Sequence, residues 1–335
     1  MSLDLGPGRH DHESVRHQLQ HALALAALLA ASAVPCRAGV TLVAGDIVLV
    51  DSFVYASASP GVWRLDPASL DTTLVSAGGL LVIPDRVAVD RSGIIHVADQ
   101  VSGVVSIDPG TGHESVLVSP STLGGRSARG ICLAPDGTLR VTTAGSNVGA
   151  VLSVDPGTGE VEVVSQGGLL SIPACVTAGP DGALYVGDLS ANSGTGSSGS
   201  IVRIEASGAQ SVLANGVPFH GPFDIAISSD GWIWSAQWGW TSRRNGGFVR
   251  TRLADGFSEF FPSDRSQGVV TTADGDVLLG DCTSVGLDCY SFYRFIHRPS
   301  NGLRRDLPAG AMALVPTLTT PVRRATWGTL KTLYR

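Results

Sequence analysis

Short apolar runs on either side of a polar turn with glycine form the dominant pattern of this chain. The clearest copy lies between Pro222 and Trp234, where two such runs flank the dipeptide Asp230–Gly231. Short apolar runs bounded by glycine turns predict β-strands joined as hairpins. The glycines of the corresponding turns are Gly45, Gly93, Gly137, Gly182, Gly231 and Gly275.

These turns recur at a nearly constant distance along the chain. The glycines are 48, 44, 45, 49 and 44 residues apart. A period in the forties with strand-rich units is typical of β-propeller blades. Several units continue with a third strand and a second turn, such as Asp-Pro-Gly-Thr-Gly at 108–112 and 155–159, and then with a fourth strand such as Val161–Val164. Four short strands per unit make one blade.

The two ends of the repeat are predicted to build one blade together. The first unit begins with a second strand at 46–50, whereas Gly310–Pro316 matches first strands such as Arg129–Pro135 but has no second strand after it. We therefore predict an all-β fold: a six-bladed β-propeller with four-stranded blades, whose ring is closed when the C-terminal strand joins the N-terminal blade and covers its open edge. The segment 39–43 is the alternative candidate for that place.

The N-terminus has the pattern of an export signal. Arg9 and Arg16 precede an apolar run at 22–33, and small residues offer cleavage after Ala33 or Ala38;. The apolar run is short for a membrane span, and an uncleaved anchor is the alternative. We expect a signal peptide at 1–38, the propeller at 39–316 and a basic tail at 317–335, and a secreted or periplasmic protein with no transmembrane segment after cleavage.

Composition narrows the class of partner without identifying one. The 335 residues carry a net charge of −6, and only 16% of them are charged. A negative chain is unsuited to binding nucleic acid. The hydrophobic fraction of 43% is sufficient for a large core. We expect a monomer whose partner is an unknown small molecule, a glycan or a protein.

Four of the five cysteines fall into two kinds. Cys282 and Cys289 lie in one connecting segment, and in an oxidising compartment they are expected to form a disulfide;. A metal site is the alternative, although no second pair of Cys or His accompanies them. Cys132 and Cys175 lie inside apolar runs and are expected to be buried thiols;.

The beginnings of the first strands should meet at one mouth of the central channel. The residues at these positions are Asp85, Arg86, Arg129, His220, Asp224 and Gln267. One hypothesis is a hydrolase or lyase with Asp85 and Asp224 as metal ligands and with His220, Asp224 and Arg129 as catalytic residues. The alternative is that Asp85–Arg86 and Asp224–Arg129 are structural ion pairs.

Acidic residues also recur at the ends of the second strands. They are Asp51, Asp99, Asp188 and Asp281. A residue that returns blade after blade is expected to serve the blade's own hydrogen bonding rather than catalysis.

One connection between strands, at 237–247, carries side chains suited to ligand binding. Trp238, Trp240 and Arg243 lie within a few residues of one another. Indole and guanidinium groups can stack on a sugar, on an aromatic ligand or on a partner protein. The alternative is a loop that folds back on its own tryptophans. The predicted ligand-binding set is Asp85, Arg86, Gln267, Trp238, Trp240 and Arg243.

Parts of the repeat resemble known propeller families. Pro84–Asp99 resembles the NHL-type unit, and Asp230–Gly239 followed by Val249 and Arg250 resembles units of the gluconolactonase/regucalcin and streptogramin B lyase families. The resemblance covers about 270 residues, mainly at blade-forming positions.

The resemblance implies specific expectations about a metal. Lactonases of that group hold a divalent ion at the channel mouth with acidic and amide side chains, and the matching positions here are Asp85, Asp224 and Gln267, which would bind calcium, magnesium or zinc. Residues 39–61 contain no glutamate, which the lactonases have in their first blade.

The sequence as a whole leaves two candidate functions. One is a binding scaffold that uses the face with the long loops, and the other is a metal-dependent lactonase, hydrolase or lyase at the channel mouth.

Overall fold

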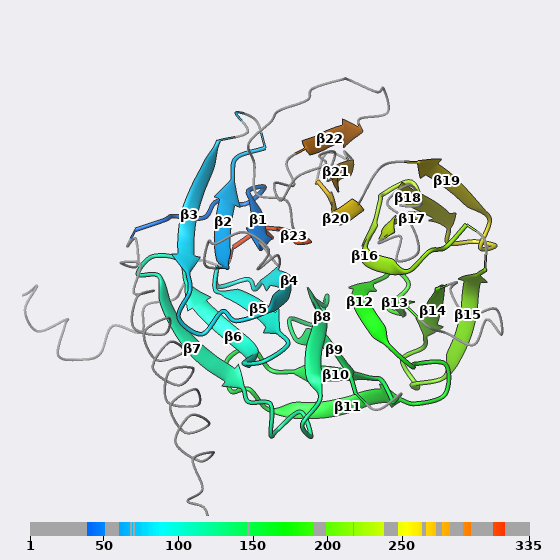
Figure 1. Cartoon of the computed structure of the whole chain (residues 1–335), viewed down its shortest axis with the longest axis horizontal. Helices are drawn as coiled ribbons and strands as arrows, with labels where there is room; N and C mark the ends of the chain where they lie inside the picture. The colour runs from blue at the N-terminus through cyan, green and yellow to red at the C-terminus, as the bar shows by residue number, and fades with distance from the viewer. Residues whose placement is uncertain are drawn as a thin grey trace, which may run out of the picture. The chain divides into compact units, whose positions relative to one another are not determined.

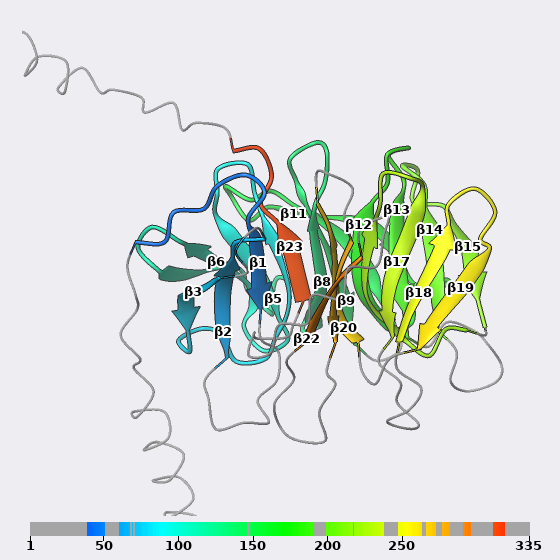
Figure 2. The same cartoon turned by 90° about the horizontal axis from the view of Figure 1, so that it is seen from above.

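Strands form all the regular structure of the described residues. The computed structural model describes residues 39–50, 60–67, 69, 71–145, 148–189, 199–216, 218–237, 247–262, 266–272, 277–281, 291–295 and 311–318, which all lie within one compact unit, Cys36–Arg335. Its sheets are arranged around a common axis (Figure 1), and their strands run along that axis (Figure 2). The part of the chain that the structure describes contains no helix able to cross a membrane.

The first three sheets follow one another in the sequence. The sheet β23-β1-β2-β3 contains Ala311–Leu314, Ile47–Val50, Gly61–Leu65 and Thr72–Ala77. The sheet β4-β5-β6-β7 contains Pro84–Val89, Ile95–Asp99, Gly103–Asp108 and His113–Val118. The sheet β8-β9-β10-β11 contains Ser127–Leu133, Leu139–Ala144, Ala150–Val154 and Val161–Gln166.

The remaining three sheets continue the same order. The sheet β12-β13-β14-β15 contains Pro173–Ala178, Leu184–Asp188, Ser200–Ile204 and Gln210–Asn215. The sheet β16-β17-β18-β19 contains Pro222–Ile227, Trp232–Gln237, Gly247–Arg252 and Ser258–Pro262. The last sheet has three described strands, β20 (Ser266–Thr271), β21 (Val277–Asp281) and β22 (Ser291–Phe295). The predicted all-β fold with four-stranded blades is therefore confirmed.

The C-terminal strand belongs to the first sheet. β23 pairs antiparallel with β1, with Ala311 opposite Val50 and Leu314 opposite Ile47. Residues 39–43, the alternative candidate for this place, precede β1 and form no strand. Each first strand contacts the first strand of the next sheet, and β23 contacts both β20 and β4.

The glycine turns take the conformation that the repeat requires. Gly93 has a φ of 88°, a region that favours glycine;. The carboxylate of Asp90 accepts hydrogen bonds from the backbone N–H groups of Ser92 and Ile94, which fixes this turn. The same Asp90 lies 3.0 Å from Nε2 of the buried His96. The hairpin between β4 and β5 is thus held by local hydrogen bonds that its own sequence supplies.

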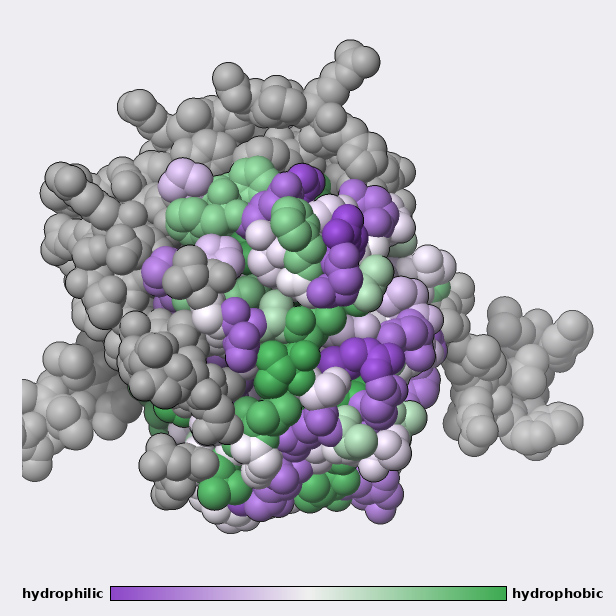
Figure 3. All heavy atoms as spheres, turned by 90° about the vertical axis from the view of Figure 1, so that its right-hand side faces the viewer, coloured by the Kyte–Doolittle hydropathy of each residue, from purple (hydrophilic) through white to green (hydrophobic). Residues whose placement is uncertain are grey.

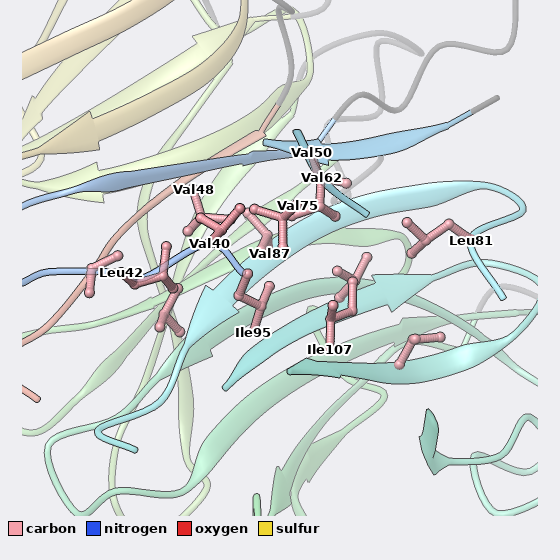
Figure 4. Close-up of a cluster of buried hydrophobic side chains, with 14 of the residues drawn as sticks. Val40, Leu42, Val48, Val50, Val62, Val75, Leu81, Val87, Ile95 and Ile107 are labelled. Carbon is pink, nitrogen blue, oxygen red and sulfur yellow. The ribbon is translucent and has the colours of Figure 1, made fainter. Parts of the chain in front are cut away.

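Burial decreases from the first strand of a sheet to the fourth. All six residues of β4 are buried, whereas β7 is mostly exposed or half-buried. Faces of neighbouring sheets pack together: a cluster joins Val48 and Val62 of the first sheet to Ile95 of the second (Figure 4). Each such side chain contributes about 1.5–3 kcal/mol by its burial. The outer surface over β15 and β19 mixes hydrophobic and hydrophilic residues (Figure 3).

Candidate functional site

The first strands begin, and the second strands end, at the same end of the sheets. Pro84 is paired with Asp99, and Pro222 is paired with Gln237. The third strands begin at the same end, because Gly103 is paired with Asp99 and Gly247 is paired with Gln237. We call this end of the sheets the mouth face.

Irregular pairing marks the first strands at the mouth face. The register shifts between Pro84 and Arg86 in β4 and between Pro222 and Asp224 in β16. The residues between them, Asp85 and Phe223, are therefore extra residues in a β-bulge. A bulge bends its strand and redirects side chains, and bulges are frequent beside functional sites.

An ion pair connects two sheets that are separated by two others in the chain order. The Nε atom of Arg86 in β4 lies 3.2 Å from Oδ1 of Asp224 in β16. The Phe223 ring lies 4.0 Å from the Arg86 guanidinium carbon and adds a cation–π contact;. The other Asp224 oxygen accepts a hydrogen bond of 3.0 Å from the backbone N–H of Val269 in β20. Asp224 therefore links β4, β16 and β20.

A second carboxylate is shared by two guanidinium groups. Nη1 of Arg86 lies 3.1 Å from Oδ1 of Asp85, and Nε of Arg129 lies 2.8 Å from Oδ2. Gln100 donates a hydrogen bond of 3.1 Å to Oδ2. The predicted pair Asp85–Arg86 is present. The predicted pair Asp224–Arg129 is wrong: Arg129 stands on β8, which packs against β4, so the carboxylate within its reach is Asp85.

The four charged residues form one cluster, which we call the charge clasp: Asp85, Arg86, Arg129 and Asp224. The side chains of Asp85 and Arg86 are 2% and 3% exposed, Asp224 is 8% exposed, and Arg129 is 18% exposed. Burying charges costs several kcal/mol each unless they are paired. In the charge clasp the charges are paired, because two guanidinium groups lie beside two carboxylates.

Burial also raises the pKa of one residue of the charge clasp, Asp224. Desolvation raises the pKa of Asp224 to about 6, although the positive charge of Arg86 and the hydrogen bond from Val269 favour its ionised form. A carboxyl group with such a pKa can exchange a proton near neutral pH.

The described contacts of His220 are with residues outside this cluster. The His220 ring meets the ring of Phe260 edge-on at 6.1 Å, and its backbone N–H donates to Oε1 of Gln237 at 3.0 Å. Among the described contacts none joins the His220 ring to Asp224 or Arg129. Of the three predicted catalytic residues, Asp224 and Arg129 belong to the charge clasp, whereas His220 has no described contact with it.

The other predicted ligand-binding residues and the predicted disulfide have side chains outside the described part of the structure. Gln267 lies in β20, but its side chain is outside the described set. Trp238, Trp240, Arg243 and the predicted disulfide Cys282–Cys289 lie outside the described residues.

The recurring acids Asp99 and Asp188 form hydrogen bonds within their own blades. Oδ2 of Asp99 accepts hydrogen bonds from the backbone N–H groups of Val82 and Ile83, and Oδ1 accepts those of Val101 and Ser102. Asp188 accepts the corresponding bonds from Ser171 and Ile172. The expectation that such acids support the blade is confirmed at both described positions. The side chains of Asp51 and Asp281 lie outside the described ones.

Sequence analysis missed three neighbours of the clasp: Gln100, Phe223 and Cys175. The thiol of Cys175 lies 3.6 Å from the carbonyl oxygen of Pro222, and burial raises its pKa. Phe223 could have been found from its place next to Asp224 in the sequence, but its position beneath Arg86 depends on the bulge in β16.

Comparison with known proteins rests on structure alone, since no family model and no curated protein sequence matches the chain. A chain of a nidogen/laminin complex superposes with a TM-score of 0.62 at 11% identity, covering 82% of this chain and 100% of that chain. The chain is a β-propeller. A calcium-binding regucalcin from Agrobacterium tumefaciens superposes on this propeller with a TM-score of 0.52 at 19% identity, covering 73% of this chain and 88% of its own.

A third similar structure is a catalytically inactive virginiamycin B lyase from Staphylococcus aureus with quinupristin. It has a TM-score of 0.52 at 14% identity, and the match covers 81% of this propeller and 88% of the lyase chain. At these identities the likeness concerns the fold, so the function of this propeller has to be argued from its own residues.

The clasp does not fit a divalent cation. Both oxygens of Asp85 face guanidinium groups, and Asp224 is bound by Arg86 and by Val269. A cation there would lie beside two positive charges. Within the described residues no group of three His, Cys, Asp or Glu side chains is placed to hold a metal. The guanidinium of Arg86 occupies the position between the two carboxylates.

Proposed function

We propose that this propeller is a binding scaffold that holds a small molecule, a glycan or a partner protein on its mouth face. The observation that carries the proposal is the charge clasp. Because Asp85 and Asp224 are already neutralised by arginine, they are suited to fixing the first strands in place rather than to holding a metal. Rigid strands that carry variable connections are the usual arrangement of a binding face.

The proposed scaffold is a closed ring of six blades. The pairing of β23 with β1 and the contact of β23 with both β20 and β4 support closure. The sheet β20-β21-β22 would be the sixth blade. Closure leaves no first-strand edge open to other chains, which suits a monomer.

The connection 238–246 is the proposed contact region. It joins Gln237 to Gly247, and both of these residues are paired at the mouth face. Its Trp238, Trp240 and Arg243 are residue types that dominate binding interfaces;.

The test is capture of partners and glycans by the immobilised full chain. We expect the double variant Trp238→Ala/Trp240→Ala to lose most of the captured ligand. Phe257→Ala is the matched control, because Phe257 is an exposed aromatic residue in the turn beyond Arg252, at the opposite end of the same sheet. Equal capture by the double variant and the wild type would refute the proposed contact region.

A second candidate is a hydrolase, lactonase or lyase at the channel mouth. The elevated pKa of Asp224 favours it, because a carboxyl group that titrates near pH 6 can act as an acid or a base;. Turnover of a lactone panel that disappears in Asp224→Asn would support this candidate. A stoichiometric divalent ion in the purified protein, together with a fall in melting temperature on chelation, would support its metal-dependent form.

Export is part of the proposal and rests on residues 1–38;. Mass determination of the protein from the periplasmic or extracellular fraction should show a chain that begins near residue 34 or 39. A full-length chain in the membrane fraction would instead indicate an uncleaved anchor.

A further inference from the structure

The guanidinium groups of the charge clasp have unused hydrogen-bond donors. Nη1 of Arg86 donates to the backbone carbonyl and to Oδ1 of Asp85. Nε of Arg86 is near Asp224 but is not aligned for a hydrogen bond, and Nη2 has no partner among the described residues. Nε of Arg129, although 2.8 Å from Asp85, also lacks an aligned partner there.

Unused donors of this kind indicate a missing acceptor. A buried polar group without a partner costs about 1–3 kcal/mol, and more when it is charged. Native proteins therefore supply a partner from the chain, from water or from a ligand. The Arg86 side chain is only 3% exposed, so bulk water does not reach it freely.

Two guanidinium groups meet at the same place. Arg86 and Arg129 bind different oxygens of the single Asp85 carboxylate, so they lie on the two sides of one small group. Arg129 is 18% exposed and thus opens the cluster to solvent. Guanidinium groups bind carboxylates through pairs of parallel hydrogen bonds, which makes a second carboxylate the fitting acceptor.

We propose that the mouth of this propeller holds a small carboxylate anion beside the Asp85 carboxylate, bound by the guanidinium groups of Arg86 and Arg129. This inference deepens the proposed binding function, on which it rests, by naming the chemical class of a ligand. The same carboxylate chemistry could come from a free organic acid or from an acidic side chain of a partner.

The charges of the clasp make this binding depend on pH. The groups that act on Asp224 are Arg86 and Asp85 from β4, Cys175 from β12 and the backbone N–H of Val269 from β20. When Asp224 is ionised, the four charged residues sum to zero. When Asp224 takes up a proton, the cluster has one net positive charge, and an added carboxylate then neutralises it. Anion binding is therefore stronger below the pKa of Asp224, which is about 6.

The test is calorimetric titration of the full chain with sodium acetate at about pH 5 and about pH 7.5, on either side of that pKa. Acetamide, which has the same shape and no charge, is the control ligand. We expect acetate to bind more tightly at the lower pH and acetamide to give no binding heat. Arg129→Gln should weaken acetate binding at least about tenfold, a loss typical of a charged hydrogen bond.

Matched variants keep the result interpretable if the clasp is sensitive to mutation. Arg126→Gln changes a half-buried arginine near the beginning of the same strand and should leave acetate binding unchanged. Asp224→Asn imitates the protonated carboxyl group and should bind acetate equally well at both pH values. Equal affinity in Arg129→Gln and wild type, or equal heats for acetate and acetamide, would overturn the site.

Competition identifies the source of the carboxylate. Displacement of acetate by a short blocked peptide with one aspartate would assign the group to a partner protein, and lack of displacement would assign it to a free acid. If acetate fails to bind while partner capture still depends on Trp238 and Trp240, this site is refuted and the proposed binding function stands.

Discussion

At the scale of single residues, Arg86 has the largest structural role in the charge clasp. It contacts Asp85 on its own strand and both Phe223 and Asp224 on β16. Its removal would leave Asp224 buried with the backbone N–H groups of Val269 and Ile225 as its described partners. A buried charge that loses its counterion is among the most destabilising changes in proteins.

We expect Arg86→Met to lower the free energy of unfolding by about 3–5 kcal/mol, the usual cost of breaking a buried pair. Arg252→Met is the control, because Arg252 and its partner Asp255 are both exposed. That control should leave the free energy of unfolding nearly unchanged, because exposed ion pairs contribute little to stability. Urea unfolding of both variants measures the difference, and equal midpoints would show that the clasp does not stabilise the fold.

A pH-dependent stability follows from Asp224. The pKa of this carboxyl group is about 6 in the folded protein and near the ordinary value of 3.8 when unfolded. The folded state therefore binds the proton more tightly. The stabilisation from this residue is complete below the unfolded pKa and is lost as the pH rises through about 6, by about 3 kcal/mol in total.

The Asp224→Asn variant isolates this effect from that of the other carboxyl groups. Between about pH 4 and about pH 7, the stability of the wild type should fall relative to that of the variant. Urea midpoints across this range give the measurement. A constant difference between the two proteins would mean that Asp224 titrates normally.

At the scale of the single blade, the acids that end the second strands hold the hairpins. Asp99 accepts four backbone N–H groups, two from the residues before β4 and two from the turn after β5. This carboxylate therefore accepts hydrogen bonds from four N–H groups that lie outside the strands. The buried side chain of Asp99 thus connects the residues before β4 to the turn after β5 at the mouth face.

We expect Asp99→Ala to destabilise the protein by about 2–4 kcal/mol, because four backbone N–H groups lose the buried carboxylate that accepts their hydrogen bonds;. Asp136→Ala removes an acid from an exposed turn and should cost less than about 1 kcal/mol;. Hydrogen exchange of the amides of Val82 and Val101 would locate the loss. Unchanged protection of these amides in Asp99→Ala would contradict this role.

At the scale of the whole propeller, the C-terminal strand determines whether the first sheet is complete. Every residue of β1 is buried, and β23 covers one of its edges. An uncovered edge of a buried strand is a template for pairing with other chains.

Truncation tests this arrangement directly. A chain that ends before Ala311 should aggregate or melt well below the wild type, whereas a chain that ends at Leu318 should keep the melting temperature of the wild type. Light scattering and thermal unfolding provide the comparison. A monomeric, stable chain without β23 would show that this strand is dispensable.

The sequence predicted the repeat, the turns and the membership of the blades, because these depend on contacts between residues close together in the chain. Short apolar runs specified the strands, and turns such as the one at Gly93 carry their own hydrogen bonds;. It also predicted the recurring role of Asp99 and Asp188, and placed the acids and arginines at one mouth.

Only the tertiary structure determined how those charged residues pair. Sequence analysis matched Asp224 with Arg129, whereas the structure matches Asp224 with Arg86 and gives Arg129 to Asp85. Such pairing depends on the bulges in β4 and β16 and on which strands lie next to each other around the axis. The elevated pKa of Asp224 has the same origin, because burial is a property of the assembled sheets and not of the residues beside it in the chain;.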